Sequence, residues 1–166
     1  MATVVFVLGD DVSTDVIYPG RYMATVLPTE TPQFAFADYA EFNGRLKAKL
    51  IPPGSVIVAG KNFGCGSSRE QAVSTLKGYD LTIVAESFAR IFMQNSINLG
   101  LKLIVAPEVK ASEGDQIEVL PDRVVNNTTG AASPTVRLPE ARQAIIDAGG
   151  LIAYTRTLLM QRRAGA

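Results

Sequence analysis

The chain has 166 residues, of which 47% are hydrophobic and 19% charged, and its 16 basic residues balance 16 acidic ones. This length and composition predict a globular protein that folds as a single domain over residues 1–166. The zero net charge argues against a dedicated nucleic-acid binder, which would carry a basic excess.

The residue types that are missing restrict the chemistry. The sequence has no histidine and one cysteine, Cys65. One cysteine excludes an intrachain disulfide and a metal site built from several cysteines of this chain. Because histidine is the commonest general base and metal ligand, acid–base chemistry must fall to Ser, Asp, Glu, Lys or Tyr, or to another chain.

The N-terminal segment opens with an apolar run, residues 3–8, that no basic region precedes. The run is too short for a signal peptide or a membrane span, so we expect a buried strand in a cytoplasmic chain without a membrane partner. Asp15 follows in an acidic and then apolar stretch that turns at Pro19-Gly20. It is expected either to face a site or to form an Asx turn or helix N-cap.

The centre of the chain alternates strands with helices. Apolar runs predict three strands, at residues 55–59, 81–85 and 102–106. The first intervening helix is expected to end near Gly78, and the second, residues 88–97, to be capped by Ser87. This order with short links predicts parallel strands joined by right-handed crossovers.

The flanking segments follow other patterns. Residues 25–33 contain two prolines and predict a loop, and the aromatic-rich residues 34–42 predict a short helix. After Pro107, the sequence predicts an antiparallel hairpin at 116–120 and 124–127, a strand at 135–138, a helix at 139–148 with proline first, and a final short helix at 151–160.

Residues 60–72, GKNFGCGSSREQA, lie between the first central strand and its helix. Glycines allow positive φ angles and a close approach to a ligand, and unpaired N–H groups at a helix start attract anions. Arg69 adds a planar cationic fork suited to a carboxylate, and Ser67 and Ser68 add hydroxyls. The stretch predicts an anion-binding pocket with a serine participant, at the sheet edge where α/β proteins bind ligands.

The same stretch has other interpretations. Ser67 with Glu70, or Ser68 with Gln71, would form a capping box that only begins a helix. The stretch is not a Walker A loop, since no Lys-Ser/Thr follows the last glycine, nor a dinucleotide fingerprint, since the glycine spacing differs. A serine-hydrolase triad is excluded because the chain has no histidine.

Four stretches resemble the family of 3-isopropylmalate dehydratase small subunits in the aconitase superfamily: residues 9–22, 60–72, 85–101 and 148–154. The resemblance implies an α/β fold, a three-layer β/β/α swivelling domain like the aconitase C-terminal domain. It further implies a hydro-lyase of leucine biosynthesis that isomerises 2-isopropylmalate to 3-isopropylmalate. A large subunit would carry the 4Fe–4S cluster, with no cofactor or metal bound by this chain, and the substrate would be a small hydroxy dicarboxylic acid.

The resemblance also assigns roles in the glycine-rich stretch. Ser67 would be the base that takes a proton from the carbon next to a carboxylate, and Asp15 would orient the site. Arg69 would clamp a substrate carboxylate, with Ser68 and Gly66 beside it.

Residues Tyr22, Met23, Ala24 and Thr25 fall where this family has its substrate-recognition loop. Homoaconitase-like members have an arginine at the third position, where this chain has Ala24, so an apolar or small substrate branch is expected. Alternatively the loop is merely short and mobile and says nothing about the substrate.

Gln71 departs from the family pattern, which usually has histidine there. Glutamine cannot titrate, which leaves open a related hydratase of dimethylmalate or homoaconitate, or a non-catalytic module that binds an anion or a partner. Cys65 is expected to be a small packing residue, with a redox role as the alternative. The isolated chain is also expected to be able to self-associate.

Overall fold

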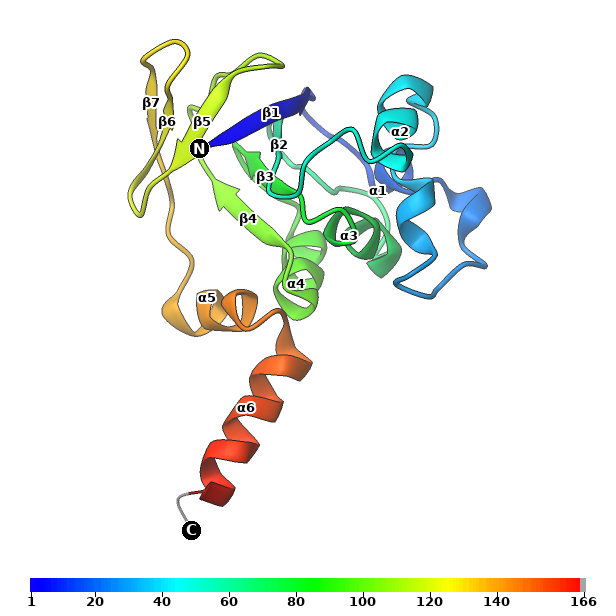
Figure 1. Ribbon diagram of the computed structural model, residues 1–166, viewed down its shortest axis with the longest axis vertical. Helices are drawn as coiled ribbons and strands as arrows, with labels where there is room; N and C mark the ends of the chain where they lie inside the picture. The colour runs from blue at the N-terminus through cyan, green and yellow to red at the C-terminus, as the bar shows by residue number, and fades with distance from the viewer. Residues whose placement is uncertain (165–166) are drawn as a thin grey trace.

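A mixed sheet of seven strands organises the computed structural model, which describes residues 1–164 (Figure 1). The strand order is β4-β3-β2-β1-β5-β6-β7. β1 to β4 pair in parallel, and β5 to β7 continue the sheet antiparallel from β1. The strands are β1 (Ala2–Val7), β2 (Val56–Ala59), β3 (Thr82–Ala85), β4 (Lys102–Val105), β5 (Gln116–Val119), β6 (Arg123–Asn126) and β7 (Ala132–Pro134). The predicted parallel centre and hairpin are confirmed.

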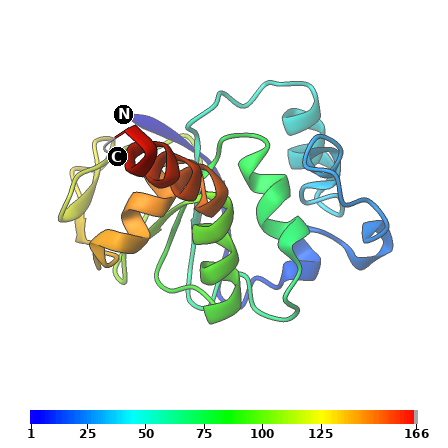
Figure 2. The same cartoon turned by 90° about the horizontal axis from the view of Figure 1, so that it is seen from below.

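Two helices, α3 (Glu70–Lys77) and α4 (Arg90–Leu99), connect β2 to β3 and β3 to β4. They pack side by side against the parallel strands (Figure 2). Because side chains alternate along a strand, Ile57 and Ile83 point to this face and share a core with Leu76 of α3 and Phe92 of α4.

The alternate residues of the same strands point the other way. Val58 and Val84 share a second core with Ile117 of β5 and Val124 of β6. The antiparallel ribbon therefore covers the face opposite the helices. Ribbon, parallel sheet and helices form the three β/β/α layers that the sequence resemblance implied.

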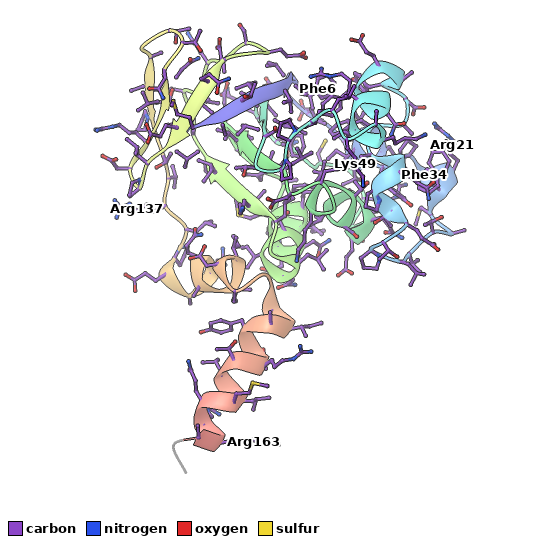
Figure 3. All side chains as sticks on the ribbon, viewed as in Figure 1. Phe6, Arg21, Phe34, Lys49, Arg137 and Arg163 are labelled. Carbon is purple, nitrogen blue, oxygen red and sulfur yellow. The ribbon has the colours of Figure 1, made fainter. Side chains whose placement is uncertain are left out.

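Further helices surround these layers: α1 (Thr14–Ile17), α2 (Ala40–Lys47), α5 (Glu140–Asp147), α6 (Leu151–Ala164), and the 3₁₀ helices η1 (Gly20–Tyr22) and η2 (Thr31–Phe34). Helix α6 projects from the body, with Arg163 near its far end (Figures 1 and 3). No residue of α6 is buried. Within residues 1–164, no helix has both the length and the apolar character that crossing a membrane requires.

The predicted helix at residues 34–42 is wrong. Helix η2 ends at Phe34 and α2 begins only at Ala40. Between them Phe36 has a φ of 50°, and its N–H donates to the carbonyl of Ile17 at 2.8 Å. Its ring is fully buried, 5.5 Å from the ring centroid of Phe6. The burial of this side chain overrides the local helical pattern.

The predicted strand at 135–138 is also wrong. Strand β7 lies earlier in the chain and pairs with β6. Val136 then makes an isolated antiparallel bridge to Val105, beside the edge of the parallel strands. The chain crosses at this point from the ribbon to β4.

Three helix boundaries differ from the prediction. Ser87 does not cap α4, whose N-cap is Ala89; the Ser87 hydroxyl instead accepts the N–H of Asn62 at 2.9 Å. Pro139 is the N-cap of α5 rather than its first residue, and α6 is longer than predicted, ending at Ala164.

Candidate active site

The glycine-rich loop between β2 and α3 packs closely against two neighbours. Gly64 has a φ of 82°, and a Cβ there would lie 2.1 Å from the Phe92 ring of α4. At Gly60 a Cβ would lie 2.0 Å from a carboxylate oxygen of Asp10. Gly64 is required, because a side chain there would strain the backbone and displace the Phe92 ring. At Gly60 a side chain would displace the Asp10 carboxylate.

The same loop runs beside the segment that leads into α1. The N–H of Gly64 donates to the carbonyl of Val12 at 2.7 Å, and the N–H of Thr14 donates to that of Cys65 at 2.8 Å. Two of the stretches singled out in the sequence, residues 9–22 and 60–72, therefore lie side by side.

Ser67 is joined to Thr14 by three polar contacts. Its N–H donates to the Thr14 hydroxyl at 3.1 Å, and the two hydroxyl oxygens lie 3.1 Å apart. The Thr14 hydroxyl also lies 3.3 Å from the Ser67 carbonyl oxygen, to which it can donate. Thr14 is buried, whereas Ser67 is half-buried. The Ser67 side chain is thus fixed from the interior and remains partly open to solvent.

The capping-box interpretation of the serines is wrong. Helix α3 begins at Glu70 with Arg69 as its N-cap, and this cap makes no side-chain capping hydrogen bond to the helix. The helix starts two residues later than a box headed by Ser67 requires. The hydroxyl of Ser67 is left for Thr14, and Ser68 is exposed, with its carbonyl accepting from Asn95 of α4 at 3.1 Å.

Arg69 forms an ion pair with Asp15 of α1. The Arg69 side chain is 16% exposed and that of Asp15 58% exposed. The Arg69 Nε is buried and, among the described residues, has no hydrogen-bond partner. A Cβ on Gly20 would lie 3.3 Å from both the Arg69 Nη2 and an Asp15 oxygen. The guanidinium is thus confined by Asp15 and the backbone at Gly20.

Asp15 is not the cap of its own helix. Ser13 caps α1, with its hydroxyl accepting the N–H of Val16 at 3.3 Å. The Asx-turn or N-cap interpretation of Asp15 is therefore wrong, because its carboxylate is directed to Arg69.

The segment with Tyr22, Met23, Ala24 and Thr25 continues from Gly20. The hydroxyl of buried Tyr18 lies 3.0 Å from the carbonyl oxygen of Tyr22 and 3.3 Å from that of Thr25. Burial raises the pKa of Tyr18, and its hydrogen bond to Thr25 opposes the rise. Met23 and Ala24 are exposed. The loop therefore has a fixed base and an apolar, accessible tip.

The arginine beside this loop, Arg21, already has an ion-pair partner. Arg21 makes a two-pronged ion pair with Asp38, one prong of which measures 3.2 Å. This hydrogen bonding holds the pKa of Asp38 below its ordinary value. Tyr22 stacks on Phe34 with ring centroids 4.1 Å apart. In Figure 3, Arg21 and Phe34 are labelled at this end of the molecule.

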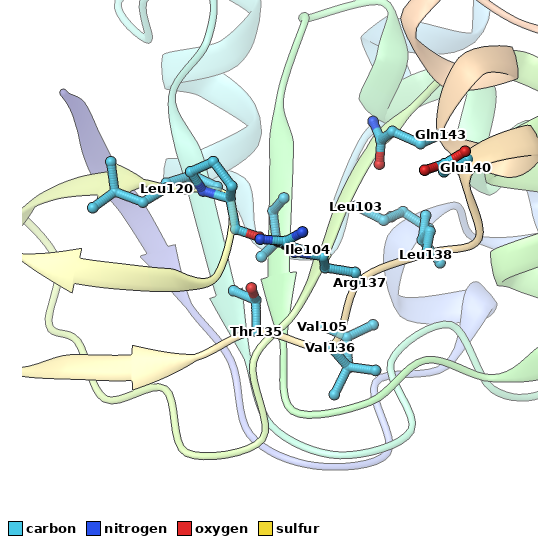
Figure 4. A pocket seen from close by; sticks show the side chains of 12 residues that line it. Leu103, Ile104, Val105, Leu120, Thr135, Val136, Arg137, Leu138, Glu140 and Gln143 are labelled. Carbon is cyan, nitrogen blue, oxygen red and sulfur yellow. Dashed lines mark hydrogen bonds between the residues drawn. The ribbon is translucent and has the colours of Figure 1, made fainter.

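A cavity of about 430 Å³ lies elsewhere, between β4, the β5–β6 turn and the start of α5 (Figure 4). It is lined mainly by aliphatic side chains such as Leu103, Val136 and Leu138. The sequence-predicted site residues do not line it.

Within residues 1–164 no three side chains of His, Cys, Asp or Glu are grouped as a metal site. The Cys65 thiol lies 3.3 Å from the Asp11 carbonyl.

The structure therefore brings Arg69 and Asp15 together beside Gly20, and it joins Ser67 to Thr14, the residue before Asp15. Ser68 and Gly66 lie in the same loop as Ser67. Thr14 was missed in the sequence. It lies within residues 9–22, next to Asp15, but no sequence pattern links it to Ser67, which is 53 positions further along the chain.

Known proteins were compared with this chain. Residues 18–108 match the family of aconitase C-terminal domains. The isopropylmalate/citramalate isomerase small subunit of Methanocaldococcus jannaschii is 44% identical over 159 residues, covering 92% of this chain and 91% of that protein. The 3-isopropylmalate dehydratase small subunits of Methanosarcina mazei and Lachnospira eligens are 41% and 42% identical, each covering 93% of this chain and 95% and 93% of their own lengths.

A solved structure agrees with these relatives. The crystal structure of 3-isopropylmalate dehydratase from Methanocaldococcus jannaschii superposes with a TM-score of 0.88 at 35% sequence identity. The match covers 99% of this chain and 98% of that one.

Proposed function

Because the chain belongs to the 3-isopropylmalate dehydratase small subunits, within the family of aconitase C-terminal domains, we propose that its glycine-rich loop binds and deprotonates the substrate. The chain is the small subunit of a heteromeric hydro-lyase of leucine biosynthesis that works with a large subunit. Two observations support the proposal: the Ser67 hydroxyl lies 3.1 Å from that of Thr14, and Asp15, the residue after Thr14, is paired with Arg69.

Ser67 is the proposed base. Its ionised hydroxyl takes the proton from the carbon next to a carboxylate, the C–H electrons form the carbon–carbon double bond, and hydroxide leaves the neighbouring carbon. Rehydration of the enoic acid with the hydroxyl on the other carbon completes the isomerisation. The N–H groups at the start of α3 are proposed to favour the ionised hydroxyl, with a smaller contribution from Arg69, whose charge Asp15 partly offsets.

A 4Fe–4S cluster is proposed on the large subunit, where it would supply a Lewis acid for the departing hydroxide. This chain has a single thiol for such a cluster, and its Sγ faces the Asp11 carbonyl. A three-cysteine donor set must therefore come from another chain.

Arg69 is proposed to bind a substrate carboxylate. Asp15 engages its Nη1, so that among the described residues Nη2 has no side-chain hydrogen bond and can donate to a ligand. Asp15 holds the guanidinium in place, and Ser68 and Gly66 line the approach. Gln71 lies in the first turn of α3, half-buried, in place of the usual family histidine.

The loop at residues 22–25 is proposed to select the substrate branch. It offers Met23 and Ala24 at its exposed tip, and Arg21 is held by Asp38. Among the described residues of this loop, a third carboxylate would find no unpaired cation, and it would be costly to bury. An isopropyl or methyl branch is favoured, with a dimethylmalate hydratase as the alternative, and homoaconitate is disfavoured.

The test is co-expression with a large subunit and measurement of enoic-acid formation. Ser67→Ala is expected to lower kcat by about 10²–10⁴, the usual contribution of a positioned base. Ser112→Ala, which removes an exposed hydroxyl in the loop before β5 and keeps the backbone N–H that Asp115 accepts, is the control and is expected to change kcat much less. Equal kcat values for the wild-type and Ser67→Ala complexes would contradict the proposal. A wild-type complex without turnover would favour a non-catalytic binding module.

A further inference from the structure

Thr14 contacts Ser67 from the interior of the protein, and the proposed reaction gives it no role. It is 1% exposed and stands in the first turn of α1. Its backbone is held on both sides, because its N–H donates to the Cys65 carbonyl at 2.8 Å and its own carbonyl accepts the N–H of Tyr18 at 2.9 Å. The hydroxyl is therefore presented from a fixed position.

The Thr14 hydroxyl can donate only one hydrogen bond at a time. A threonine hydroxyl has one hydrogen to donate and two lone pairs. One lone pair accepts the Ser67 N–H, at 3.1 Å. The single hydrogen has two possible acceptors, the Ser67 carbonyl at 3.3 Å and the Ser67 Oγ at 3.1 Å. The same donor can thus serve either acceptor after a rotation about its C–O bond.

We propose that Thr14 is a positioning residue that stabilises the ionised form of Ser67. When Ser67 Oγ is an alkoxide, it becomes the stronger acceptor of the two, and the Thr14 hydroxyl donates to it. When Ser67 has taken the substrate proton, it can donate to Thr14 or to solvent, and the Thr14 hydrogen can return to the carbonyl. The proton that moves is the one between substrate carbon and Ser67; the hydrogen of Thr14 stays on its own oxygen. The inference rests on the proposed role of Ser67.

Among the described residues, Thr14 is the hydrogen-bond partner of the Ser67 hydroxyl. Arg69 and Glu70 follow Ser67 in the chain, but Arg69 is paired with Asp15, and Glu70 is exposed at the start of α3. A hydrogen bond to an ionised group is shorter and stronger than one between neutral groups. Thr14 therefore supports the alkoxide more than it supports the neutral serine.

The matched variants are Thr14→Val, Thr14→Ser and Thr31→Val. Thr14→Val keeps the shape and removes the hydroxyl, and Thr14→Ser restores it. Thr31 is the control, because it is also buried and its hydroxyl lies 2.9 Å from that of Ser74, away from the site. All are measured in the complex with the large subunit.

Thr14→Val is expected to lower kcat about 10- to 100-fold, with KM changed about twofold or less, which is the size of a lost hydrogen bond to a charged group. The ascending limb of the kcat/KM–pH profile should move to higher pH by about one unit. Thr14→Ser should restore both, and Thr31→Val should change neither. Hydrogen–deuterium exchange at the Ser67 amide should speed up in Thr14→Val alone, which reports the lost acceptor without relying on turnover.

The outcomes separate the inference from the function that it rests on. If Ser67→Ala abolishes turnover while Thr14→Val keeps the wild-type pH profile and kcat, Thr14 has no such role and the proposed base stands. The same conclusion follows if Thr14→Ser fails to rescue. If Ser67→Ala is fully active, the proposed function fails, and the inference fails with it.

Discussion

Arg69 combines burial, a fixed partner and an accessible edge. Its side chain is 16% exposed, its Nη1 is bound by Asp15, and Gly20 leaves room beside Nη2. Such confinement preserves the planar geometry that makes an arginine a two-pronged carboxylate ligand. At this position a charge alone is therefore insufficient.

Arg69→Lys is accordingly expected to be severe. Lysine keeps the charge but cannot bind Asp15 and a substrate carboxylate in one plane, so kcat/KM should fall about 10- to 100-fold, mostly through KM. Steady-state kinetics of the complex measure this. Arg45→Lys is the control, because Arg45 lies 4.0 Å from Glu113 in an exposed pair away from the site. Equal effects of the two substitutions would contradict a geometric role for Arg69.

The sequence led to Ser67, Arg69 and Asp15 because each belongs to a recognisable local pattern. Their separate patterns predict chemistry but do not predict contacts. Thr14 illustrates the difference: its partner is 53 residues away, and the pair forms only because the glycine loop packs beside α1.

Single elements were predicted well where the local pattern agreed with tertiary packing. The order of strands and helices from β2 to β4 was predicted correctly because each strand is an apolar run, and β2 and β3 contribute side chains to the cores on both faces of the sheet. Residues 34–42 failed because the buried ring of Phe36 forces a φ of 50°. Residues 135–138 failed because pairing with β6 selects Ala132–Pro134, a stretch whose composition indicates a loop.

The loop before β5 has a carboxylate whose contribution depends on pH. Asp115 is buried and accepts the N–H of Ser112 at 2.8 Å and the side-chain amide of Asn126 at 2.7 Å. These bonds hold the pKa of Asp115 below its ordinary value, the backbone bond from Ser112 first. Because the folded state favours the ionised form, its stabilising contribution is present above the unfolded pKa, about 3.9, and is lost as the pH falls through the folded pKa.

Asp115→Asn removes this titration while keeping the shape. The free energy of unfolding of the wild type should exceed that of the variant at pH 6, and the difference should shrink below about pH 4. Denaturant unfolding of both proteins over pH 2.5–7 measures this difference in the free energy of unfolding. The contributions of the other carboxylates are common to both proteins and therefore cancel. A difference that does not vary with pH would contradict the assignment.

At the scale of the whole molecule, α5 and α6 are attached to the body by close backbone packing. The backbone at Gly149 and Gly150 lies against the end of α4, and a Cβ on Gly150 would lie 2.7 Å from the carbonyl oxygen of Asn98. Lys77 of α3 reinforces the junction by donating to the carbonyls of Leu99 and Gly149. Self-association of the isolated chain stays a prediction.

Gly150→Ala and Gly149→Ala form a matched pair. Both glycines have positive φ angles, 118° and 87°, but a Cβ on Gly149 would meet nothing within 4 Å. Gly149→Ala should therefore cost about 1–2 kcal/mol of backbone strain, and Gly150→Ala about 3 kcal/mol or more, because it also displaces α4. Equal losses in denaturant unfolding would show that the junction is not tightly packed.

The central claim is that Ser67 exchanges a proton with a substrate carbon. The most direct measurement is the incorporation of solvent deuterium at that carbon when the assembled enzyme equilibrates its substrate in D₂O, followed by mass spectrometry alongside substrate binding. The wild-type complex should incorporate deuterium, and the Ser67→Ala complex should bind the substrate without incorporating it. Undiminished incorporation by a Ser67→Ala complex would contradict the claim.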